Sequence, residues 1–399
     1  MDEHFLYFEK NKEDAFSFLQ RLVRAKSANP FTPENSKPDV PIERDVAEII
    51  VEKIEALGIK AKMCGVSKER PNVLASFGKN HGKTLILNTH MDTVMPSPHY
   101  SFDPYAGIIK GNKLYGLGSA DAKGAIASFV FLLQCLVEND IDLNGKLVFT
   151  FVVDEEPGAC SKFGTHYLLE KGLVKGDAAI IGEPGSRKIN LGHRGVCRFK
   201  ITTFGQSVHT GTKEWENNEK GENAILNMVK IIEALNKHQR FRIKSENTEK
   251  LNVLTFPTII KGGNSINEVP DLCEAYADLR LWETCDLEDL ERFILSKIDE
   301  ENIDFKTLCF VPFVKISENE EIVKMLHKNA SEVLREEIKI GVARPANDGW
   351  MFITRGIPAI CGFGPRGENV HAKDEYVDLI DLVNVTKILF KTAIDFLND

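Results

Sequence analysis

The chain has 399 residues, of which 43% are hydrophobic and 27% are charged, as is usual for a globular protein. At roughly 100–200 residues per domain, this length predicts two domains. Fifty basic and fifty-nine acidic residues give a net charge of −9. This balance disfavours nucleic acid as a partner, because a negative surface repels phosphates, but it allows small anionic substrates that local arginines capture.

The sequence favours neither a membrane span nor a secretory signal. The acidic first residues, Met1 to His4, lack a basic segment followed by an apolar one. The longest apolar stretch, from Ala125 to Val137, is too short to cross a bilayer. The eight cysteines are scattered without a CxxC pair, so we expect free thiols in a cytoplasmic protein rather than disulfides or a thiolate zinc site.

Hydrophobic patterns predict alternating helices and strands in the first half of the chain. We expect helices near 12–26, 43–57 and 122–138, and strands at 72–77, 84–89, 147–153 and 178–181. The strand at 147–153 shows no polar alternation, as expected of a central strand that is buried on both faces. This order is typical of an α/β sheet covered by helices on both sides.

The pattern changes near residue 196. Strands are predicted at 196–203, 251–260 and 272–281, and helices at 221–235 and 287–298. This β-α-β-β-α order is that of a small α+β domain. Helices predicted at 320–336 and 382–397 then restore the α/β pattern. We therefore predict a catalytic domain in two parts, 1–194 and 313–399, with a second domain, 195–312, inserted between them.

Histidines and carboxylates follow several of the predicted strands. They are His90 and Asp92 after the strand at 84–89, Asp154, Glu155 and Glu156 after the strand at 147–153, Glu183 after the strand at 178–181, Asp121 just before a helix, and His371 in a late glycine-rich loop. Ligands of an open α/β sheet bind beyond the carboxyl ends of its strands, so these groups can converge.

Each of these residues alone has an ordinary structural explanation. His90 could be a hydrogen-bonded surface histidine, the 154–156 segment a solvated turn, Glu183 a loop residue and Asp121 a helix cap. Their joint occurrence at successive strand ends favours a site. Imidazole and carboxylate ligands without thiolates suit zinc or a related divalent ion, and two histidines with three carboxylates can hold two metals that share a bridging carboxylate.

The order and spacing of these residues resemble the M20 metallopeptidase family, which includes acetylornithine deacetylase, succinyl-diaminopimelate desuccinylase, aminoacylase and the glutamate carboxypeptidase enzymes. The resemblance runs from about Ala28 to His371. It rests on the motifs His90-x-Asp92, Gly118-x-x-Asp121-x-Lys123-Gly124, Asp154-Glu155-Glu156, Gly182-Glu183-Pro184, Gly192-x-Arg194-Gly195, Gly205-x-x-x-His209, Gly221-x-Asn223-Ala224-Ile225, Gly262-Gly263-x-x-x-Asn267-x-x-Pro270, Asp278-x-Arg280 and His371.

The resemblance implies a zinc-exopeptidase-like three-layer α/β catalytic domain that holds two Zn²⁺ ions, with Co²⁺ or Mn²⁺ as substitutes. One metal would be bound by His90 and Glu183 and the other by Glu156 and His371. Asp121 would bridge them, and its peptide bond to Ala122 is usually cis in the family. Asp92 would orient His90, and Glu155 would be the general base.

The resemblance also implies that the inserted domain is a ferredoxin-like lid through which two chains form a homodimer. His209 would reach the partner chain's site and stabilise the oxyanion, and Asn267 and Arg280 would bind the substrate carboxylate. One departure from the family pattern is the segment 211–220, which is longer than usual and lacks the customary proline.

The function favoured by the sequence is the hydrolysis of an amide bond in a small carboxylate-bearing substrate, most simply an N-acyl amino acid, by an enzyme of amino-acid metabolism. Two alternatives remain. One is a di- or tripeptidase or a carboxypeptidase, because these enzymes also cut an amide near a free carboxylate. The other is an inactive metal-binding homologue, which the presence of Glu155 beside every ligand disfavours.

Overall fold

A computed structural model describes residues 2–32, 35–158, 160–244 and 250–398. The chain forms two compact units. Unit 1 comprises Met1–His193 and Lys315–Asp399, and unit 2 comprises Arg194–Val314. Unit 2 thus begins at Arg194 rather than at the predicted residue 195, and it ends at Val314 rather than at residue 312.

Unit 1 is built on a six-stranded sheet with the order β1-β2-β6-β3-β7-β16. Its strands are β1 (Ala61–Cys64), β2 (Asn72–Gly78), β3 (Thr84–His90), β6 (Lys146–Val152), β7 (Ala178–Ile181) and β16 (Ala359–Ile360). The strands β6, β3, β7 and β16 run parallel, whereas β2 runs antiparallel to both of its neighbours, β6 and the edge strand β1. The carboxyl ends of the parallel strands therefore meet at one edge of the sheet.

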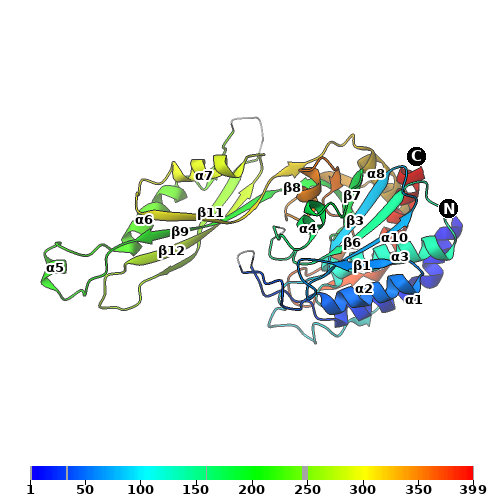
Figure 1. Ribbon diagram of the computed structural model, residues 1–399, viewed down its shortest axis with the longest axis horizontal. Coiled ribbons are helices and arrows are strands. Elements are labelled where there is room, and N and C mark those ends of the chain that lie inside the picture. The colour runs from blue at the N-terminus through cyan, green and yellow to red at the C-terminus, as the bar shows by residue number, and fades with distance from the viewer. Residues whose placement is uncertain (1, 33–34, 159, 245–249, 399) are drawn as a thin grey trace. The chain divides into compact units, whose positions relative to one another are not determined.

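Helices cover both faces of this sheet (Figure 1). Alternate residues of β3 point to opposite faces, since Leu85 and Leu87 belong to one buried cluster and Ile86 to another. The first cluster includes side chains of α1 (Asp2–Arg24), α2 (Arg44–Ala56), α3 (Gly124–Glu138), α8 (Glu321–Leu334) and α10 (Leu379–Asn398). The second includes side chains of α4 (Thr165–Glu170) and α9 (Gly349–Ile353).

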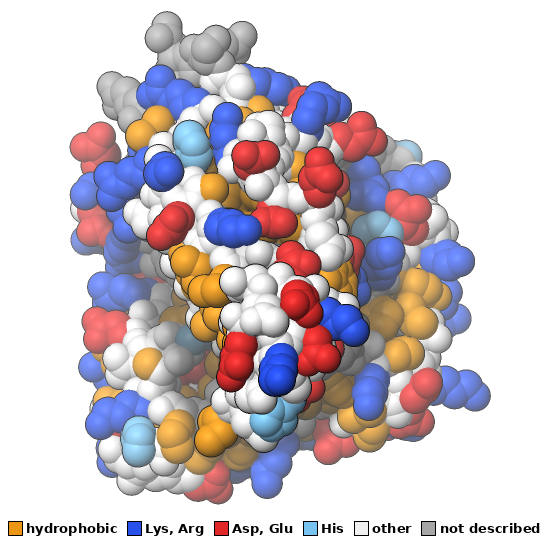
Figure 2. All heavy atoms as spheres, turned by 90° about the vertical axis from the view of Figure 1, so that its left-hand side faces the viewer, with side chains coloured by type: hydrophobic (Ala, Val, Ile, Leu, Met, Phe, Trp, Pro, Cys, Tyr) orange, Lys and Arg blue, Asp and Glu red, His pale blue; other side chains and the backbone are white. Residues whose placement is uncertain are grey.

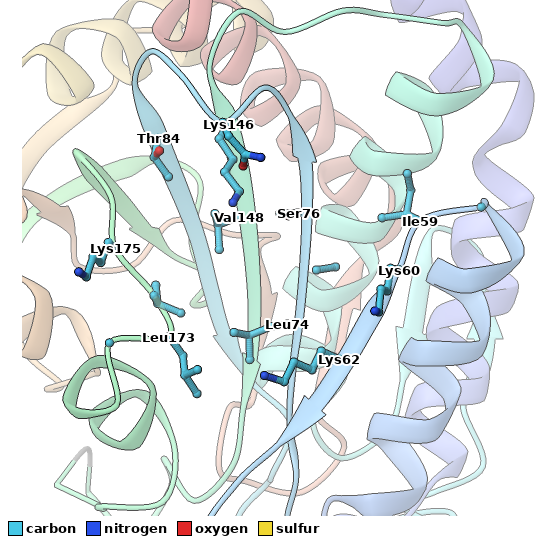
Figure 3. Close-up of a pocket in the computed structure, with 15 residues that line it drawn as sticks. Ile59, Lys60, Lys62, Leu74, Ser76, Thr84, Lys146, Val148, Leu173 and Lys175 are labelled. Atoms are coloured by element: carbon cyan, nitrogen blue, oxygen red, sulfur yellow. The ribbon is translucent and has the colours of Figure 1, made fainter.

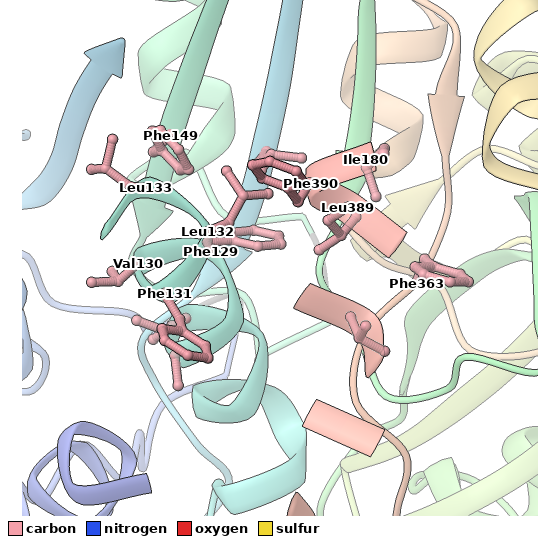
Figure 4. Close-up of a cluster of buried hydrophobic side chains, with 14 of the residues drawn as sticks. Phe129, Val130, Phe131, Leu132, Leu133, Phe149, Ile180, Phe363, Leu389 and Phe390 are labelled. Carbon is pink, nitrogen blue, oxygen red and sulfur yellow. The ribbon is translucent and has the colours of Figure 1, made fainter. Parts of the chain in front are cut away.

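The helix α3 lies at the centre of the larger cluster and packs beside α10 (Figure 4). Phe129 and Phe131 of α3 are 0% and 1% exposed. The stretch Ser119–Glu138, which contains α3, is apolar and long enough to cross a membrane, and 89% of its most apolar window is buried inside the protein. The stretch is therefore hydrophobic because α3 is a core helix. The packing of α3 also holds in place the chain segment that leads into it.

Two small sheets of short strands complete the fold of unit 1. One of them contains β14, whose residues Val314 and Lys315 lie on either side of the unit boundary. A four-stranded sheet has the order β17-β18-β5-β4, formed by β4 (Ile108–Lys110), β5 (Lys113–Tyr115), β17 (Gly367–Glu368) and β18 (Tyr376–Asp378). A three-stranded sheet has the order β14-β8-β15, formed by β8 (Lys188–His193), β14 (Val314–Lys315) and β15 (Lys339–Ala343).

Unit 2 is an antiparallel sheet with the order β10-β11-β12-β9-β13 and helices packed on it. Its elements are β9 (Gly195–Phe204), α5 (Lys213–Glu216), α6 (Ala224–Asn236), β10 (Arg240–Phe241), β11 (Asn252–Gly262), β12 (Leu272–Leu281), α7 (Leu287–Leu295) and β13 (Ile303–Val311). Buried side chains of α6 and α7 join those of β9, β11 and β12 in one core. The predicted α/β fold with an inserted ferredoxin-like α+β domain is confirmed.

Several element limits differ from those predicted. The first helix begins at Asp2 rather than near Lys12, because Phe8 is fully buried against the rings of Phe131 and Phe390. The helix predicted from Ala122 begins at Gly124 as a regular α-helix, after one irregular turn. The strand β13, which closes the edge of the unit 2 sheet beside β9, was not predicted.

Candidate metal centre

Five predicted site residues of unit 1 lie at or just after the ends of three neighbouring parallel strands, namely His90, Asp92, Glu155, Glu156 and Glu183. In the pairing of β3 with β6, His90 lies opposite Val152, which is followed by the segment Asp154–Glu156. In the pairing of β3 with β7, Asn88 lies opposite Ile181, two residues before Glu183. The parallel register therefore carries the histidine and the carboxylates to one edge of the sheet, as ligand sites of open α/β sheets require.

Two groups of possible metal ligands lie at this edge and share one residue. His90, Asp121 and Glu183 form one group, and Asp121, Glu156 and His371 form the other. Within each group, one ligand atom per residue lies within 4.8 Å of the others. These are the two sets into which the family resemblance divides the ligands.

Asp121 lies between the two histidines. Its Oδ1 is 3.1 Å from Nε2 of His90, and its Oδ2 is 3.1 Å from Nε2 of His371. The same nitrogen of His371 is 3.0 Å from Oε2 of Glu156, and Nε2 of His90 is 3.9 Å from Oε1 of Glu183. One carboxylate thus offers an oxygen to each group, which is the arrangement of a bridging ligand.

The turn that carries Asp121 is η1 (Ser119–Lys123), and its peptide bond to Ala122 is cis. Gly118 precedes it with a φ of 77°, and a Cβ at this position would lie 2.4 Å from a methyl group of Thr93. Asp121 does not cap the following helix, since the N-cap of α3 is Lys123 and makes no side-chain cap bond. The helix-cap explanation of Asp121 is therefore wrong.

The carboxylate of Glu375 holds the Asp121 turn from a distant part of the chain. It accepts hydrogen bonds from the backbone N–H groups of Gly118, Ala120 and Asp121 at 2.8, 2.9 and 3.0 Å. Glu375 is 1% exposed, and burial, with the charge of Asp121, raises its pKa to about 7. It fixes the backbone of the Asp121 turn and leaves the carboxylate of Asp121 to its contacts with the two histidines.

Asp92 is fully buried and organises the end of β3. Its carboxylate accepts the backbone N–H groups of Glu155 and Glu156 at 3.1 and 3.2 Å. The backbone oxygen of Asp92 lies 2.9 Å from Nδ1 of His90, and one carboxylate oxygen lies 3.6 Å from that nitrogen. Because a carbonyl oxygen only accepts, Nδ1 carries the proton and Nε2 is left free to bind a metal.

Negative charge is crowded at this edge of the sheet. Burial, together with the carboxylate of Glu183, raises the pKa of Glu155 well above its ordinary value. Burial and the carboxylate of Asp121 likewise raise the pKa of Glu156 and of Glu183. Buried carboxylates that resist ionisation in this way fit a site whose negative charge is balanced by bound cations.

His371 completes the second group from a tight turn. Its backbone φ is 60°, and half of its side chain is exposed. Hydrogen bonds to the carboxylates of Asp121 and Glu156 raise its pKa to about 10. The imidazole is thus aimed at two buried carboxylates from the solvent side of the group.

The predicted recognition residues lie in unit 2. Nε2 of His209 is 3.2 Å from the side-chain nitrogen of Asn267, and Nδ1 of His209 accepts the backbone N–H of Gly211 at 3.0 Å. Arg280 lies on β12 and donates from Nε and Nη2 to the two carboxylate oxygens of Asp278 at 2.6 and 3.0 Å. The structure therefore brings His209 and Asn267 together and places Arg280 in a separate ion pair.

A large pocket of unit 1 lies away from the two ligand groups. Its volume is about 670 Å³, and its lining includes Thr84 and Lys146, the first residues of β3 and β6. Figure 3 shows Lys60, Lys62, Lys146 and Lys175 around it. The ligand groups follow the opposite ends of these strands, so this pocket is not part of the candidate centre.

The chain is similar to known proteins over most of its length. Residues 86–395 match the model of peptidase family M20/M25/M40. An N-formyl-4-amino-5-aminomethyl-2-methylpyrimidine deformylase of Halalkalibacterium halodurans is 26% identical, with 98% of this chain and 96% of the relative covered. An acetylornithine deacetylase of Buchnera aphidicola is 28% identical, with 82% and 84% covered.

A solved structure shares the fold. It is a dinuclear metal-binding peptidase of the M20 family from Bacillus subtilis, with a TM-score of 0.66, 17% identity, and coverage of 96% of this chain and 99% of that one. The family match spans most of the chain, and the enzymes of this family are metal-dependent hydrolases of amide and peptide bonds. The chain belongs to peptidase family M20/M25/M40 and is a metal-dependent amidohydrolase or peptidase.

Proposed function

We propose that the two ligand groups bind two divalent ions, zinc in the first place, with cobalt or manganese as substitutes. The observation that carries this proposal is that both groups share Asp121, and one of them includes Glu156, which directly follows Glu155. The ligand atoms are imidazole nitrogens and carboxylate oxygens, a set that suits zinc-class metals. The dinuclear metal site named for the Bacillus subtilis relative supports the same stoichiometry.

His90 and Glu183 would hold one ion, Glu156 and His371 the other, and Asp121 both. When bound, the ions would lower the pKa of a water molecule and polarise the scissile carbonyl. Asp92 keeps His90 in the tautomer that leaves Nε2 available. Outer partners of this kind orient a ligand and strengthen its binding.

Glu155 is the residue that we assign to proton transfer. It directly precedes the ligand Glu156, and successive side chains at a strand end point in different directions, so one can bind metal while the other faces the substrate. Its carboxylate would take the proton of the attacking water and deliver it to the amide nitrogen, which is too basic to leave as an anion.

For the substrate, we propose an N-acyl amino acid, cleaved in the manner of an acetylornithine deacetylase or a succinyl-diaminopimelate desuccinylase. Two relatives are named for removing an acyl group from nitrogen, one an acetyl and one a formyl group. Arg280 offers a planar guanidinium, already oriented by Asp278, that suits a substrate carboxylate. Asn267 would assist in this recognition.

A short peptide is the alternative substrate. The Bacillus subtilis relative is named a peptidase, and a di- or tripeptide also presents an amide near a carboxylate. A metal-binding protein without activity is disfavoured, because Glu155 is retained beside the ligands.

We further propose a homodimer formed through unit 2, with His209 stabilising the oxyanion in the partner chain's site. Within the described residues, β10 pairs only with Val253 and Asn252 of β11, so most of the outer edge of β11 is open. Ile259 and Ile260 on this strand and Leu226 on α6 are 51%, 48% and 59% exposed. An open edge flanked by apolar side chains is suited to pairing with a second copy about a two-fold axis.

The expected location and partners of the protein are consistent with its surface charge. Acidic and basic side chains are intermixed on the face of the molecule shown in Figure 2. Such a surface, with a net charge of −9, fits a small-molecule enzyme of the cytoplasm that does not bind nucleic acid or a membrane.

One activity screen tests the proposed function. The zinc-loaded protein is assayed with N-acetyl and N-succinyl amino acids, dipeptides and an N-formyl aminomethylpyrimidine, before and after treatment with a chelator. We expect the N-acyl amino acids to be cleaved fastest and the activity to require metal. Faster cleavage of dipeptides would favour the peptidase, fastest cleavage of the formyl compound would exclude a required substrate carboxylate, and no cleavage of any substrate would favour the inactive homologue.

A further inference from the structure

Arg70 is the largest fully buried side chain in the described part of the chain, with 1% of its surface exposed. Its guanidinium donates from Nε and Nη2 to the two carboxylate oxygens of Glu43, the Nε bond being 2.7 Å long. Its Nη1 lies 2.9 Å from Oδ1 of Asp154. The rings of Phe31 and Phe163 each lie 6.0 Å from the guanidinium carbon.

These contacts converge on the residue that precedes Glu155. Asp154 has a φ of 63°, a left-handed conformation that residues other than glycine rarely adopt. Its backbone N–H donates to Glu43 at 3.1 Å, and its carboxylate accepts from Ser36 at 2.8 Å and from Ser161 at 2.6 Å. The ion pair with Arg70 therefore helps to hold the backbone at Asp154, between the end of β6 and the Glu155–Glu156 segment.

The network continues to the candidate metal centre through one side chain. The amide nitrogen of Asn29 donates to Oδ1 of Asp154 at 2.8 Å and to Oδ2 of Asp92 at 2.9 Å. Asp92 in turn accepts the N–H groups of Glu155 and Glu156. A continuous buried path thus leads from Arg70 to both backbone amides of the segment that bears the base and a metal ligand.

The charge of Arg70 matters as much as its hydrogen bonds. Glu43, Asp92 and Asp154 are 0%, 0% and 1% exposed, and Arg70 forms ion pairs with two of them. Removing one partner of a buried ion pair leaves an uncompensated charge, which is strongly destabilising. A lysine would keep the charge but could not reproduce the fork that spans Glu43 and Asp154.

We propose that Arg70 is a positioning residue of the metal centre, which acts through Asp154 and Asn29 to fix the backbone of Glu155 and Glu156. This inference rests on the proposed function, because it gives these two residues their roles in proton transfer and metal binding. Arg70 itself touches neither group of ligands and is not a catalytic residue.

The test compares Arg70→Lys with Arg44→Lys. Arg44 is a matched control, because it is 43% exposed and forms ion pairs with Glu48 and Glu69, away from the two ligand groups. Zinc binding is measured by competition with a chromophoric chelator. The temperature is one at which circular dichroism shows that each variant is folded. The kinetic constants kcat and KM are determined separately. Asn29→Ala is a milder second variant, which decides the matter if Arg70→Lys does not fold.

We expect Arg70→Lys and Asn29→Ala to bind at least one of the two ions roughly 10–100-fold more weakly, with a fall of similar size in kcat at saturating zinc and little change in KM. Arg44→Lys should match the wild type in both measurements. Variants of Arg70 and Asn29 that bind zinc and turn over substrate like Arg44→Lys would overturn the inference alone. A wild type that binds no metal would overturn the proposed function and this inference together.

Discussion

The candidate metal centre and the candidate recognition residues are built in different ways. In unit 1, Asp92 is fully buried, and each carboxylate that supports the centre is fixed by several hydrogen bonds. In unit 2, His209 and Asn267 are exposed and their side-chain nitrogens lie 3.2 Å apart, and Arg280 is held by Asp278 on its own strand. The candidate metal ligands therefore lie together within unit 1, whereas the candidate recognition residues lie in unit 2.

Metal binding and substrate recognition place different demands on the fold. Metal binding needs several ligands held within a few ångströms, which a rigid sheet edge with outer hydrogen bonds supplies. The proposed recognition role needs groups that admit a ligand and release its product, and the exposed side chains of His209 and Asn267 in unit 2 suit that need. Variants in the two units should accordingly have different kinetic effects.

The largest effect is expected for Glu155→Ala in unit 1. Because the carboxylate transfers the proton but binds no metal in our account, the variant should stay folded, keep its bound zinc and lose roughly 10²–10⁴-fold in kcat. Elemental analysis and steady-state kinetics check both halves of this expectation. Near-normal kcat with metal bound would show that another group is the base, and loss of zinc would show that Glu155 is itself a ligand.

A substitution of His209 in unit 2 tests whether this residue acts in the site of the partner chain. His209→Ala should lower kcat by roughly 10²–10³-fold, the usual cost of removing one oxyanion donor, while leaving zinc binding unchanged. If the residue acts in the partner's site, mixed dimers of His209→Ala and Glu155→Ala chains should regain part of the activity. No recovery in dimers shown to contain both chains would place the action of His209 elsewhere.

Glu375 tests the support of the bridging ligand. Glu375→Gln leaves one acceptor oxygen for the three N–H groups of the Asp121 turn. We expect zinc affinity to fall roughly 10–100-fold, as is typical for the loss of an outer partner. Glu368→Gln, at an exposed position on β17, is the control and should bind zinc like the wild type. Equal zinc affinities of the two variants would show that Glu375 does not support metal binding by Asp121.

The smallest effect is expected for Arg280→Lys, and it should appear as a change of selectivity. Lysine cannot form the bidentate contact, so turnover of N-acyl amino acids should fall at least several-fold more than turnover of the corresponding amides. The ratio of kcat/KM for each acid and its amide measures this effect. An equal loss of kcat/KM for the acid and its amide would show that Arg280 only forms the structural ion pair with Asp278.

The strand ends that carry the metal centre could be predicted from the sequence for a physical reason. Buried parallel strands such as 147–153 leave a strong hydrophobic signal, and the polar residues that follow them must lie at one edge. The positions of His90, Glu156 and Glu183 at this edge follow from that rule alone. Their division into two groups that share Asp121 came from the family resemblance.

The supporting network could not be predicted in the same way. Glu375 is separated from Gly118 by 257 residues, and Asn29 from Asp154 by 125, so no local pattern links them. Arg70 was not singled out from the sequence, because only tertiary packing buries it between Glu43 and Asp154. The helix-cap explanation of Asp121 failed because the turn before α3 is irregular and presents its carboxylate to the histidines instead.

The metal content of the purified protein decides whether the two ligand groups bind two ions. After equilibration with zinc and removal of the excess, elemental analysis should give about two ions per chain, and occupancy should decline in acid, because imidazole and carboxylate ligands must be deprotonated to bind. Chelation should abolish hydrolysis, and added zinc should restore it. A protein that retains no transition metal, and whose activity no added metal restores, would show that the two ligand groups are not a metal centre.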